Sequence, residues 1–210
     1  TTYATYGLTF DAENRMTEYK TSGDTVLLTA GYTGDGLRAW KDTDNTASNG
    51  RTYFLYDGGV LLAEMDASGS ITAVNTWGAN GLLSRRVSST TTYYAYDPQG
   101  SVAARLNSSQ TLVTSDLYDA YGSLLAGGAS DPYGYCGQWG YYKDSETGKV
   151  LCTFRYYDPA AGRWLTRDPI GYQGAMNLYG YVECNATAYS DPLGLCPKRT
   201  GFPPKSVGCS

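Results

Sequence analysis

The chain has 210 residues, of which 41% are hydrophobic and 17% are charged, and its formal net charge is -4. This length and apolar fraction suffice for one or two domains with a core of their own. The 21 tyrosines and 26 glycines favour strands and turns over the Ala, Glu, Lys and Leu mixture of long helices. Because acidic residues outnumber basic ones, no basic face is predicted, and we expect no nucleic-acid partner.

Several kinds of site are excluded by what the sequence lacks. No histidine occurs, which removes Ser-His-Asp and Cys-His catalysis and the commonest metal ligand. The five cysteines contain no Cys-x-x-Cys pair, so we expect neither a metal nor a cofactor. No stretch approaches the roughly 18 apolar residues of a membrane span, and the first residues do not resemble a signal peptide. We expect any export signal to lie outside this piece of chain.

An aromatic residue followed by an Asp-containing turn recurs along the chain at intervals of roughly 20 or 40 residues. Weaker copies at 76–81 and 143–148 fall within the two longer intervals. An internal repeat of this length predicts units that bury their apolar faces by stacking side by side. The clearest copies start at Phe10, Tyr32, Tyr56, Tyr96, Tyr118 and Tyr157.

Each copy has the chemistry of a β-hairpin turn. The aspartate can accept local backbone N–H groups, and glycine accommodates a positive φ. Apolar segments at 60–63, 101–106 and 123–125 follow as returning strands. We interpret the Tyr-Asp pairs as packing tyrosines and turn-capping aspartates rather than as ligand-binding residues. The expected fold class is all-β, a curled antiparallel β-sheet of hairpins with no substantial helix before residue 165.

The segment from residue 135 to 195 carries six distinctive motifs in one order. They occupy residues 137–138, 144–148, 154–159, 162–171, 177–182 and 191–195. Together they resemble the RHS-associated core, and the hairpin units upstream resemble YD repeats. One departure is Cys184-Asn185-Ala186, which stands where that family usually has Asn-Asn-Pro. A turn that proline would rigidify is therefore expected to be looser here.

This resemblance implies three regions: YD/RHS repeats at 1–134, an RHS-associated core at 135–195, and a variable tail at 196–210. Proteins of the family wind their repeats into a hollow β-shell that encloses a C-terminal toxin or effector. The core forms a less regular plug with at most short helices. By the same resemblance we expect a secreted or cell-surface bacterial protein. Its partners would be its own C-terminal segment and the neighbouring repeats of a parent shell.

The resemblance also assigns chemistry to two Asp-Pro steps. It implies that Asp168 and Asp191 act like the pair of an aspartic protease, with Arg167 as a helper, and cut the chain itself. Two carboxylates within about 3 Å cannot both ionise, so one would activate a water while the protonated partner donates to the leaving amine. The cleavage motif and the bond to be cut comprise Pro192, Leu193, Gly194, Leu195 and Cys196.

Other interpretations of the same residues stay open. Asp-Pro is a common turn opener, so both steps can be plain turns in an inert structural or adhesive segment. The Cys196 thiol can attack the Leu195 carbonyl and shift the acyl group to sulfur. Alternatively, Cys196 and Cys209 can form a disulfide if the protein is exported.

Two further groups of residues have simple structural interpretations. Cys136, Cys152 and Cys184 are expected to be small buried residues rather than reactive ones. An exposed aromatic platform for sugars would suit an adhesin, although packing within the sheet is the simpler explanation. That platform would comprise Trp139, Tyr141, Tyr142, Tyr156 and Trp164.

Overall fold

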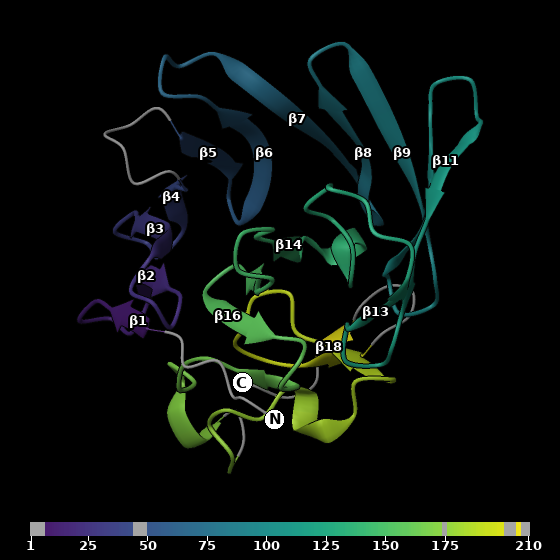
Figure 1. Ribbon diagram of the computed structural model, residues 1–210. Helices are drawn as coiled ribbons and strands as arrows, with labels where there is room; N and C mark the ends of the chain where they lie inside the picture. The colour runs from purple at the N-terminus through teal and green to yellow at the C-terminus, as the bar shows by residue number, and fades with distance from the viewer. Residues whose placement is uncertain (1–6, 44–49, 174–175, 200–204, 207–210) are drawn as a thin grey trace. The chain divides into compact units, whose positions relative to one another are not determined.

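The computed structural model describes residues 7–43, 50–173, 176–199 and 205–206. These residues form antiparallel strands and three short 3-10 helices, and they contain no α-helix (Figure 1). The all-β prediction is therefore confirmed. Among the described residues, no helix has the length and apolar character needed to cross a membrane. The chain divides into two compact units, 1–74 and 75–210, and each is described by itself.

The first unit is a meander of hairpins in which each strand pairs with the next one along the chain. Its strands alternate inward and outward side chains, which gives β3 and β6 their buried apolar positions. The last strand, β7, runs on into the second unit. The strands are β1 (Gly7–Phe10), β2 (Met16–Lys20), β3 (Val26–Tyr32), β4 (Arg38–Asp42), β5 (Arg51–Asp57), β6 (Val60–Met65) and β7 (Ile71–Gly78).

Several of the turns between strands share one hydrogen-bond pattern. Asp11 Oδ1 accepts the N–H groups of the residues two and four positions later, and Asp66, Asp97 and Asp119 do the same. The expectation that the repeat aspartates cap their turns holds for Asp11, Asp97 and Asp119, whereas in the turn after Tyr32 the Thr33 hydroxyl accepts the Leu37 N–H instead. Further turns of this kind start at Thr21 and at Asn107, between the predicted copies. Each interval of roughly 20 residues therefore holds two hairpins, and the sequence motif marks every second turn.

The second unit begins with longer hairpins and continues into short strands and 3-10 turns (Figure 1). The predicted returning strands appear as β6, β10 and β13. Strands and helices of this unit are β8 (Gly81–Val87), β9 (Thr90–Tyr96), β10 (Val102–Leu106), β11 (Leu112–Ser115), β12 (Leu117–Tyr118), β13 (Leu124–Ala126), η1 (Gly137–Trp139), β14 (Tyr142–Lys143), β15 (Val150–Cys152), β16 (Arg155–Asp158), β17 (Arg163–Trp164), η2 (Gly171–Gln173), η3 (Val182–Cys184), β18 (Tyr189–Ser190), β19 (Lys198–Arg199) and β20 (Lys205–Ser206).

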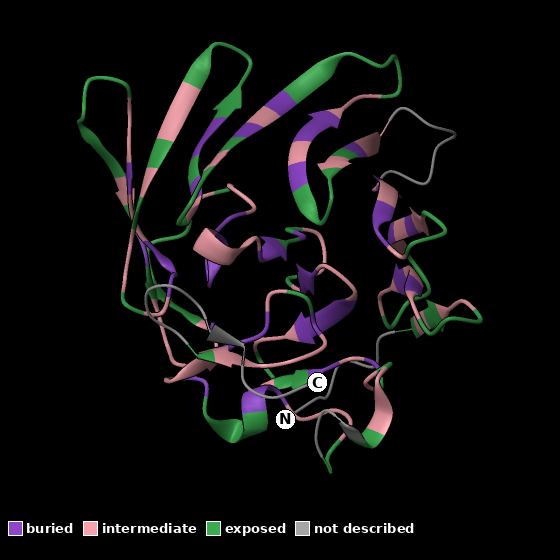
Figure 2. Ribbon diagram, turned by 180° about the vertical axis from the view of Figure 1, so that it is seen from behind, coloured by how far each residue is buried: buried purple, intermediate pink, exposed green. Residues whose placement is uncertain are grey.

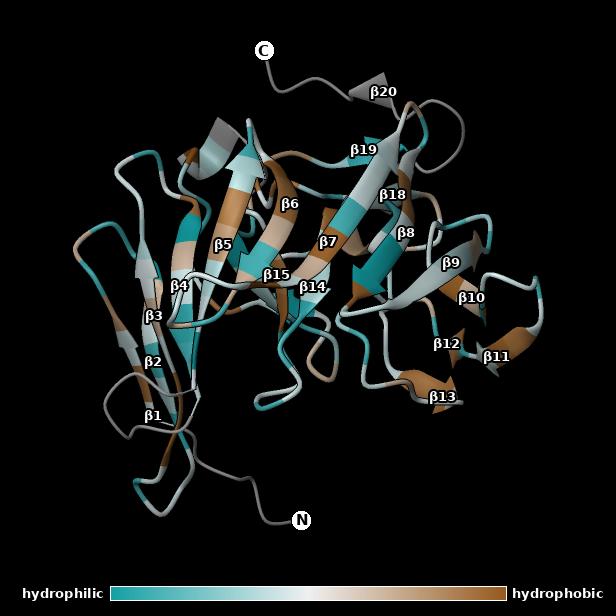
Figure 3. Cartoon of the chain, turned by 90° about the horizontal axis from the view of Figure 1, so that it is seen from above, coloured by the Kyte–Doolittle hydropathy of each residue, from teal (hydrophilic) through white to brown (hydrophobic). Residues whose placement is uncertain are grey.

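Pairing in the second unit also follows chain order. Strands β8 to β11 pair in succession, β12 pairs with β13, and β14 to β17 form a four-stranded sheet. Strand β18 pairs with β19, which pairs with β20. Strands β11 and β13 carry exposed apolar side chains, visible as brown segments in Figure 3. The predicted boundaries at 134/135 and 195/196 stay a prediction, and both fall inside this second unit.

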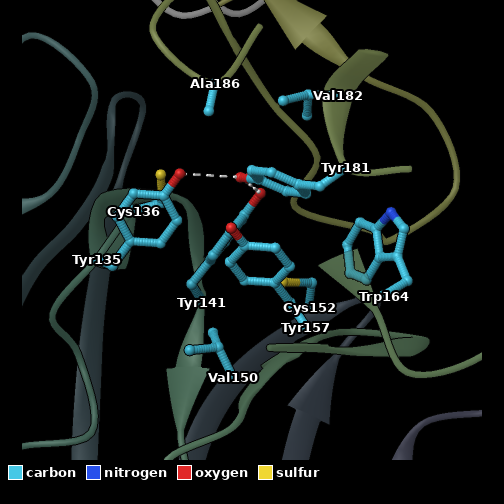
Figure 4. Close-up of a cluster of buried hydrophobic side chains, with 10 residues drawn as sticks. All are labelled: Tyr135, Cys136, Tyr141, Val150, Cys152, Tyr157, Trp164, Tyr181, Val182 and Ala186. Atoms are coloured by element: carbon cyan, nitrogen blue, oxygen red, sulfur yellow. Dashed lines mark hydrogen bonds between the residues drawn. The ribbon is translucent and has the colours of Figure 1, made fainter. Parts of the chain in front are cut away.

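The core of the second unit is a cluster of aromatic side chains (Figure 4). The Tyr181 ring lies 4.1 Å from the Tyr157 ring and 5.4 Å from the Trp164 ring, measured between centroids. The Tyr141 and Tyr181 hydroxyls are 2.9 Å apart, and Tyr135 donates to Tyr181. Burial raises the pKa of Tyr141 and Tyr181 well above 10, so both hydroxyls keep their protons and act as hydrogen-bond partners.

This burial contradicts the sugar-binding platform. Four of its five members are buried, and β15 and β16 are among the strands drawn as buried in Figure 2. An aromatic ring with almost no accessible surface cannot stack on a sugar, because stacking needs an open face. Only Trp139 is partly exposed, and its indole N–H donates to the Gln99 carbonyl. The buried members are Tyr141, Tyr142, Tyr156 and Trp164.

Candidate active site

Asp191 lies directly after β18 and is 1% exposed. It opens a turn in which the Gly194 N–H donates to its carbonyl at 3.1 Å. Its Oδ1 accepts the N–H groups of Leu195 at 3.0 Å and of Cys196 at 3.1 Å. The carboxylate therefore contacts the nitrogen of the Leu195–Cys196 bond, the predicted cleavage site. The Asp191 N–H donates to the Tyr141 hydroxyl at 2.6 Å, which ties this turn to the aromatic core.

Burial changes the acidity of Asp191. Removal from water raises the pKa of its carboxyl above the ordinary value, while the N–H of Leu195 and the charge of Arg155 act in the opposite direction. The raised pKa means that the proton is held to a higher pH than on an exposed aspartate. A carboxyl in this state can serve as a proton donor.

Asp168 follows β17 and is held by the backbone around it. Its N–H donates to the Leu178 carbonyl at 3.0 Å, and its Oδ1 accepts the Ile170 N–H at 3.0 Å. Its Oδ2 lies 2.8 Å from Nη2 of Arg155. Asp168 is therefore both a turn residue and one half of a buried ion pair, in which its side chain is 9% exposed.

Arg155, on β16, joins the two aspartates. Its Nη2 lies 2.8 Å from Asp168 Oδ2 and 3.6 Å from Asp191 Oδ2, and its Nε donates to the Gly194 carbonyl. The guanidinium carbon lies 4.1 Å from the centre of the Trp164 ring. Among the described residues no hydrogen bond joins the two carboxylates directly. The expected proton-sharing contact is thus replaced by a guanidinium that both acids approach.

The structure brings Arg155, and not Arg167, to the carboxylates. Arg167 is exposed, and its Nε donates to the Tyr179 hydroxyl at 3.3 Å. Arg167 and Asp168 both lie outside the strands, and Arg167 is exposed while the Asp168 side chain is only 9% exposed. Among the described residues Arg167 forms no ion pair with either aspartate, and its role as a helper stays a prediction. Arg155 belongs to the motif at 154–159, but nothing in its spacing from Asp168 or Asp191 marked it as their partner.

Gly194 allows the chain to pass close to β15 and β16. It has a φ of 70°, and a Cβ at this position would lie 2.8 Å from the Cys152 carbonyl oxygen and 3.1 Å from the Arg155 nitrogen. Both contacts are with backbone atoms, which cannot move aside easily. The predicted need for glycine at this position is therefore accounted for. The neighbouring Leu193 is 36% exposed and Leu195 is half-buried.

The cysteines agree with one of the open alternatives at Cys196 and differ from the expectation at Cys184. Cys196 is disulfide-bonded, and in that state its sulfur offers no thiolate for an acyl shift. Its predicted partner, Cys209, lies outside the described residues. Cys136 and Cys152 are free and buried, as expected, whereas Cys184 is free and exposed. Cys184 was expected to be buried, but it lies in a turn with a φ of 61° at the surface of the unit.

A meander of Asp-capped hairpins that leads into a compact aromatic core defines a segment of a repetitive β-shell. The family model described as Teneurin YD-shell matches residues 66–183, more than half of the chain. The chain therefore belongs to the RHS/YD-repeat shell family, as the sequence motifs predict.

Two curated relatives and one solved structure illustrate the similarity. The tRNA3(Ser)-specific nuclease WapA of Bacillus spizizenii is 34% identical over 199 residues, covering 89% of this chain and 8% of the relative. Toxin subunit YenC1 of Yersinia entomophaga is 36% identical over 112 residues, covering 50% of this chain and 11% of the relative. The crystal structure of TcdB2-TccC3 without its hypervariable C-terminal region matches with a TM-score of 0.70 at 22% identity, covering 90% of this chain and 10% of that one. This chain thus spans a small fraction of each relative.

Proposed function

We propose that this chain is the C-terminal part of an RHS shell that cuts itself between Leu195 and Cys196. The observation that carries the proposal is the position of Asp191. Its Oδ1 lies 3.1 Å from the Cys196 nitrogen, and its other oxygen lies 3.6 Å from the guanidinium that also holds Asp168. Asp191 thus contacts the nitrogen of the bond, and Arg155 links Asp191 to Asp168.

The reaction is a hydrolysis with a general base and a general acid. Asp168, as the base, takes a proton from a water whose oxygen adds to the Leu195 carbonyl carbon. The Cys196 nitrogen becomes basic once the carbonyl carbon is tetrahedral, and Asp191 supplies its proton. The carbon–nitrogen bond then breaks, leaving a carboxylate on Leu195 and an amine on Cys196. Because the substrate is part of the same chain, each molecule reacts once.

Arg155 has two functions in this scheme. Its charge balances the carboxylates at every stage, and its Nε holds the Gly194 carbonyl one residue before the bond that is cut. Burial lowers the pKa of Arg155, and the negative charge of Asp168 opposes this shift.

The wider function is proposed from the relatives. One is a nuclease and another is a toxin subunit, and both are many times longer than this chain. We infer that the parent shell of this chain encloses an effector that follows residue 195, and that the protein is secreted or displayed at a bacterial surface. The partners of this chain would be its own C-terminal segment and the adjoining shell repeats.

A second candidate function is a shell segment that does not cut itself. The hydrogen bonds from Leu195 and Cys196 to Asp191 favour it, because an aspartate that accepts N–H groups four and five residues later also stabilises a turn. Without hydrolysis, Asp191 and Arg155 would act only as structural residues. The two candidates differ in one measurable property, which is whether the chain stays whole.

Intact mass spectrometry of the purified chain separates them. Wild type is expected to yield a fragment ending at Leu195, whereas Asp168→Asn and Asp191→Asn are expected to stay whole. Asparagine has nearly the same shape and keeps an acceptor oxygen, so the turn should persist while proton transfer is lost. Asp119→Asn is the matched control, since Asp119 caps a turn with two similar hydrogen bonds but has no arginine beside it. A wild-type chain that remains whole would favour the non-cleaving segment.

A further inference from the structure

The β15–β16 turn is hydrogen-bonded to the three residues that precede Leu195. Thr153 Oγ1 donates to the Pro192 carbonyl at 3.0 Å, and the Phe154 N–H donates to the Leu193 carbonyl at 3.2 Å. Arg155 Nε donates to the next carbonyl, that of Gly194. Three consecutive donors of one segment therefore hold three consecutive carbonyls of the other.

We propose that this turn is a cradle that sets the register of the cleavage motif, with Thr153 as a positioning residue for the hydrolysis. The inference rests on the proposed self-cleavage and deepens it. Each of the three carbonyls before Leu195 has its own donor, so this segment cannot slide by one residue without breaking three hydrogen bonds at once. Leu195, the next residue, is thereby the one presented to Asp191. The cradle selects which bond is cut, and the acids carry out the chemistry.

The backbone of Thr153 supports a role for its side chain. Thr153 has a φ of 45°, in the left-handed region where β-branched residues are strained. The turn has two residues between paired Cys152 and Arg155, and such turns favour Asn or Gly at this position. Glycine would adopt this conformation without strain, but it has no hydroxyl to offer. The strained residue supplies a side-chain donor to a backbone carbonyl of the cleavage motif.

Gly194 limits what the cradle accepts. The site has no room for a Cβ, because the Cys152 carbonyl oxygen and the Arg155 nitrogen already occupy the space. Pro192 and the exposed Leu193 are held through their carbonyls, so their side chains are not selected by these bonds. The cradle therefore recognises backbone register and a glycine at the second position before the cut. A small misplacement there is costly, since displacement by about 1 Å can slow a reaction about 100-fold.

The test follows the rate of cleavage of the full chain during cell-free synthesis, with samples taken over time for intact mass. Thr153→Val keeps the shape and the strain but removes the hydroxyl, and we expect cleavage to slow about tenfold. Thr153→Ser restores the hydroxyl and should recover most of the rate. Thr72→Val is the matched control, because the Thr72 hydroxyl also donates to a backbone carbonyl, far along the chain from the motif.

A fourth variant separates positioning from folding. Thr153→Gly relieves the backbone strain, so it should fold at least as stably as wild type and still cleave slowly. In all Thr153 variants the dependence of the rate on pH should keep its wild-type shape, since the acids are untouched. Wild-type rates in both the Val and the Gly variants would overturn the cradle while the proposed function stands. A wild-type chain that stays whole would overturn both.

Discussion

The Arg155–Asp168 pair allows the electrostatics of the site to be tested independently of cleavage. The two side chains are 3% and 9% exposed, with 2.8 Å between Nη2 and Oδ2. Asp191→Asn, which is expected not to cleave, provides a background in which every variant stays whole. In that background Arg155→Met removes the charge while retaining most of the side-chain length. Asp168 is then left as a buried carboxylate without its cation.

The expected loss of folding stability in Arg155→Met follows from the burial of this ion pair. Removing one partner of a buried ion pair destabilises a protein by about 3–5 kcal/mol, because the remaining charge is uncompensated. Part of the loss comes from the stacking of Arg155 on the Trp164 ring, where a desolvated cation–π contact contributes about 2 kcal/mol. When Asp168 is also changed to Asn, only the stacking and packing losses remain. Arg155→Met should then cost about 2 kcal/mol less.

Unfolding by guanidinium chloride at neutral pH, followed by tryptophan fluorescence, measures the free energy of unfolding of the four variants in this double-mutant cycle. The four variants are Asp191→Asn by itself, Asp191→Asn combined with Arg155→Met, Asp191→Asn combined with Asp168→Asn, and the variant that carries all three substitutions. Asp119→Asn in place of Asp168→Asn is the control, and it should show no coupling to Arg155→Met. A coupling of Arg155 to Asp168 within about 0.5 kcal/mol of zero would refute the inferred buried pair.

Two further predictions concern the turn at Asp191. Gly194→Ala should lose about 1–3 kcal/mol of stability and nearly all cleavage, whereas Gly148→Ala, with the same φ of 70° but open space around its Cβ position, should lose about 1 kcal/mol and cleave normally. If both variants lost the same amount of stability in unfolding experiments and the same amount of cleavage in mass spectra, the close approach at Gly194 would be unimportant. Cleavage should also slow as pH rises through the pKa of Asp191, because burial raises that pKa and the acid must hold its proton. A rate that increases with pH would assign the proton donor to another group.

The sequence motifs contain most of the residues of the site, but they do not show which of these residues lie together. Asp168 and Asp191 were assigned by the family resemblance, and the structure places both beside one guanidinium. Arg155 was missed because it comes 13 residues before Asp168 on another strand. Thr153 was missed for the same reason. Hairpin pairing places these residues together, and a linear pattern does not show which side chains of a strand face a distant turn.

What the sequence determined by itself is local. The Tyr-Asp turns, the returning strands and the absence of long helices follow from residue chemistry within a few positions, because an aspartate and a glycine specify a hairpin turn without help from distant segments. The family resemblance likewise rested on contiguous motifs. Even here, the turns at Thr21 and Asn107 carried too weak a signal to be predicted.

Only the tertiary structure decided which charges meet and which aromatic rings are buried. Arg155 rather than Arg167 faces the acids, and Trp164 lies in the core instead of at a sugar-binding surface. The physical reason is that burial and ion pairing depend on the packing of segments far apart in sequence. Arg155 lies on β16, which packs into the core, whereas Arg167 lies outside the strands at the surface, so the two arginines have entirely different surroundings.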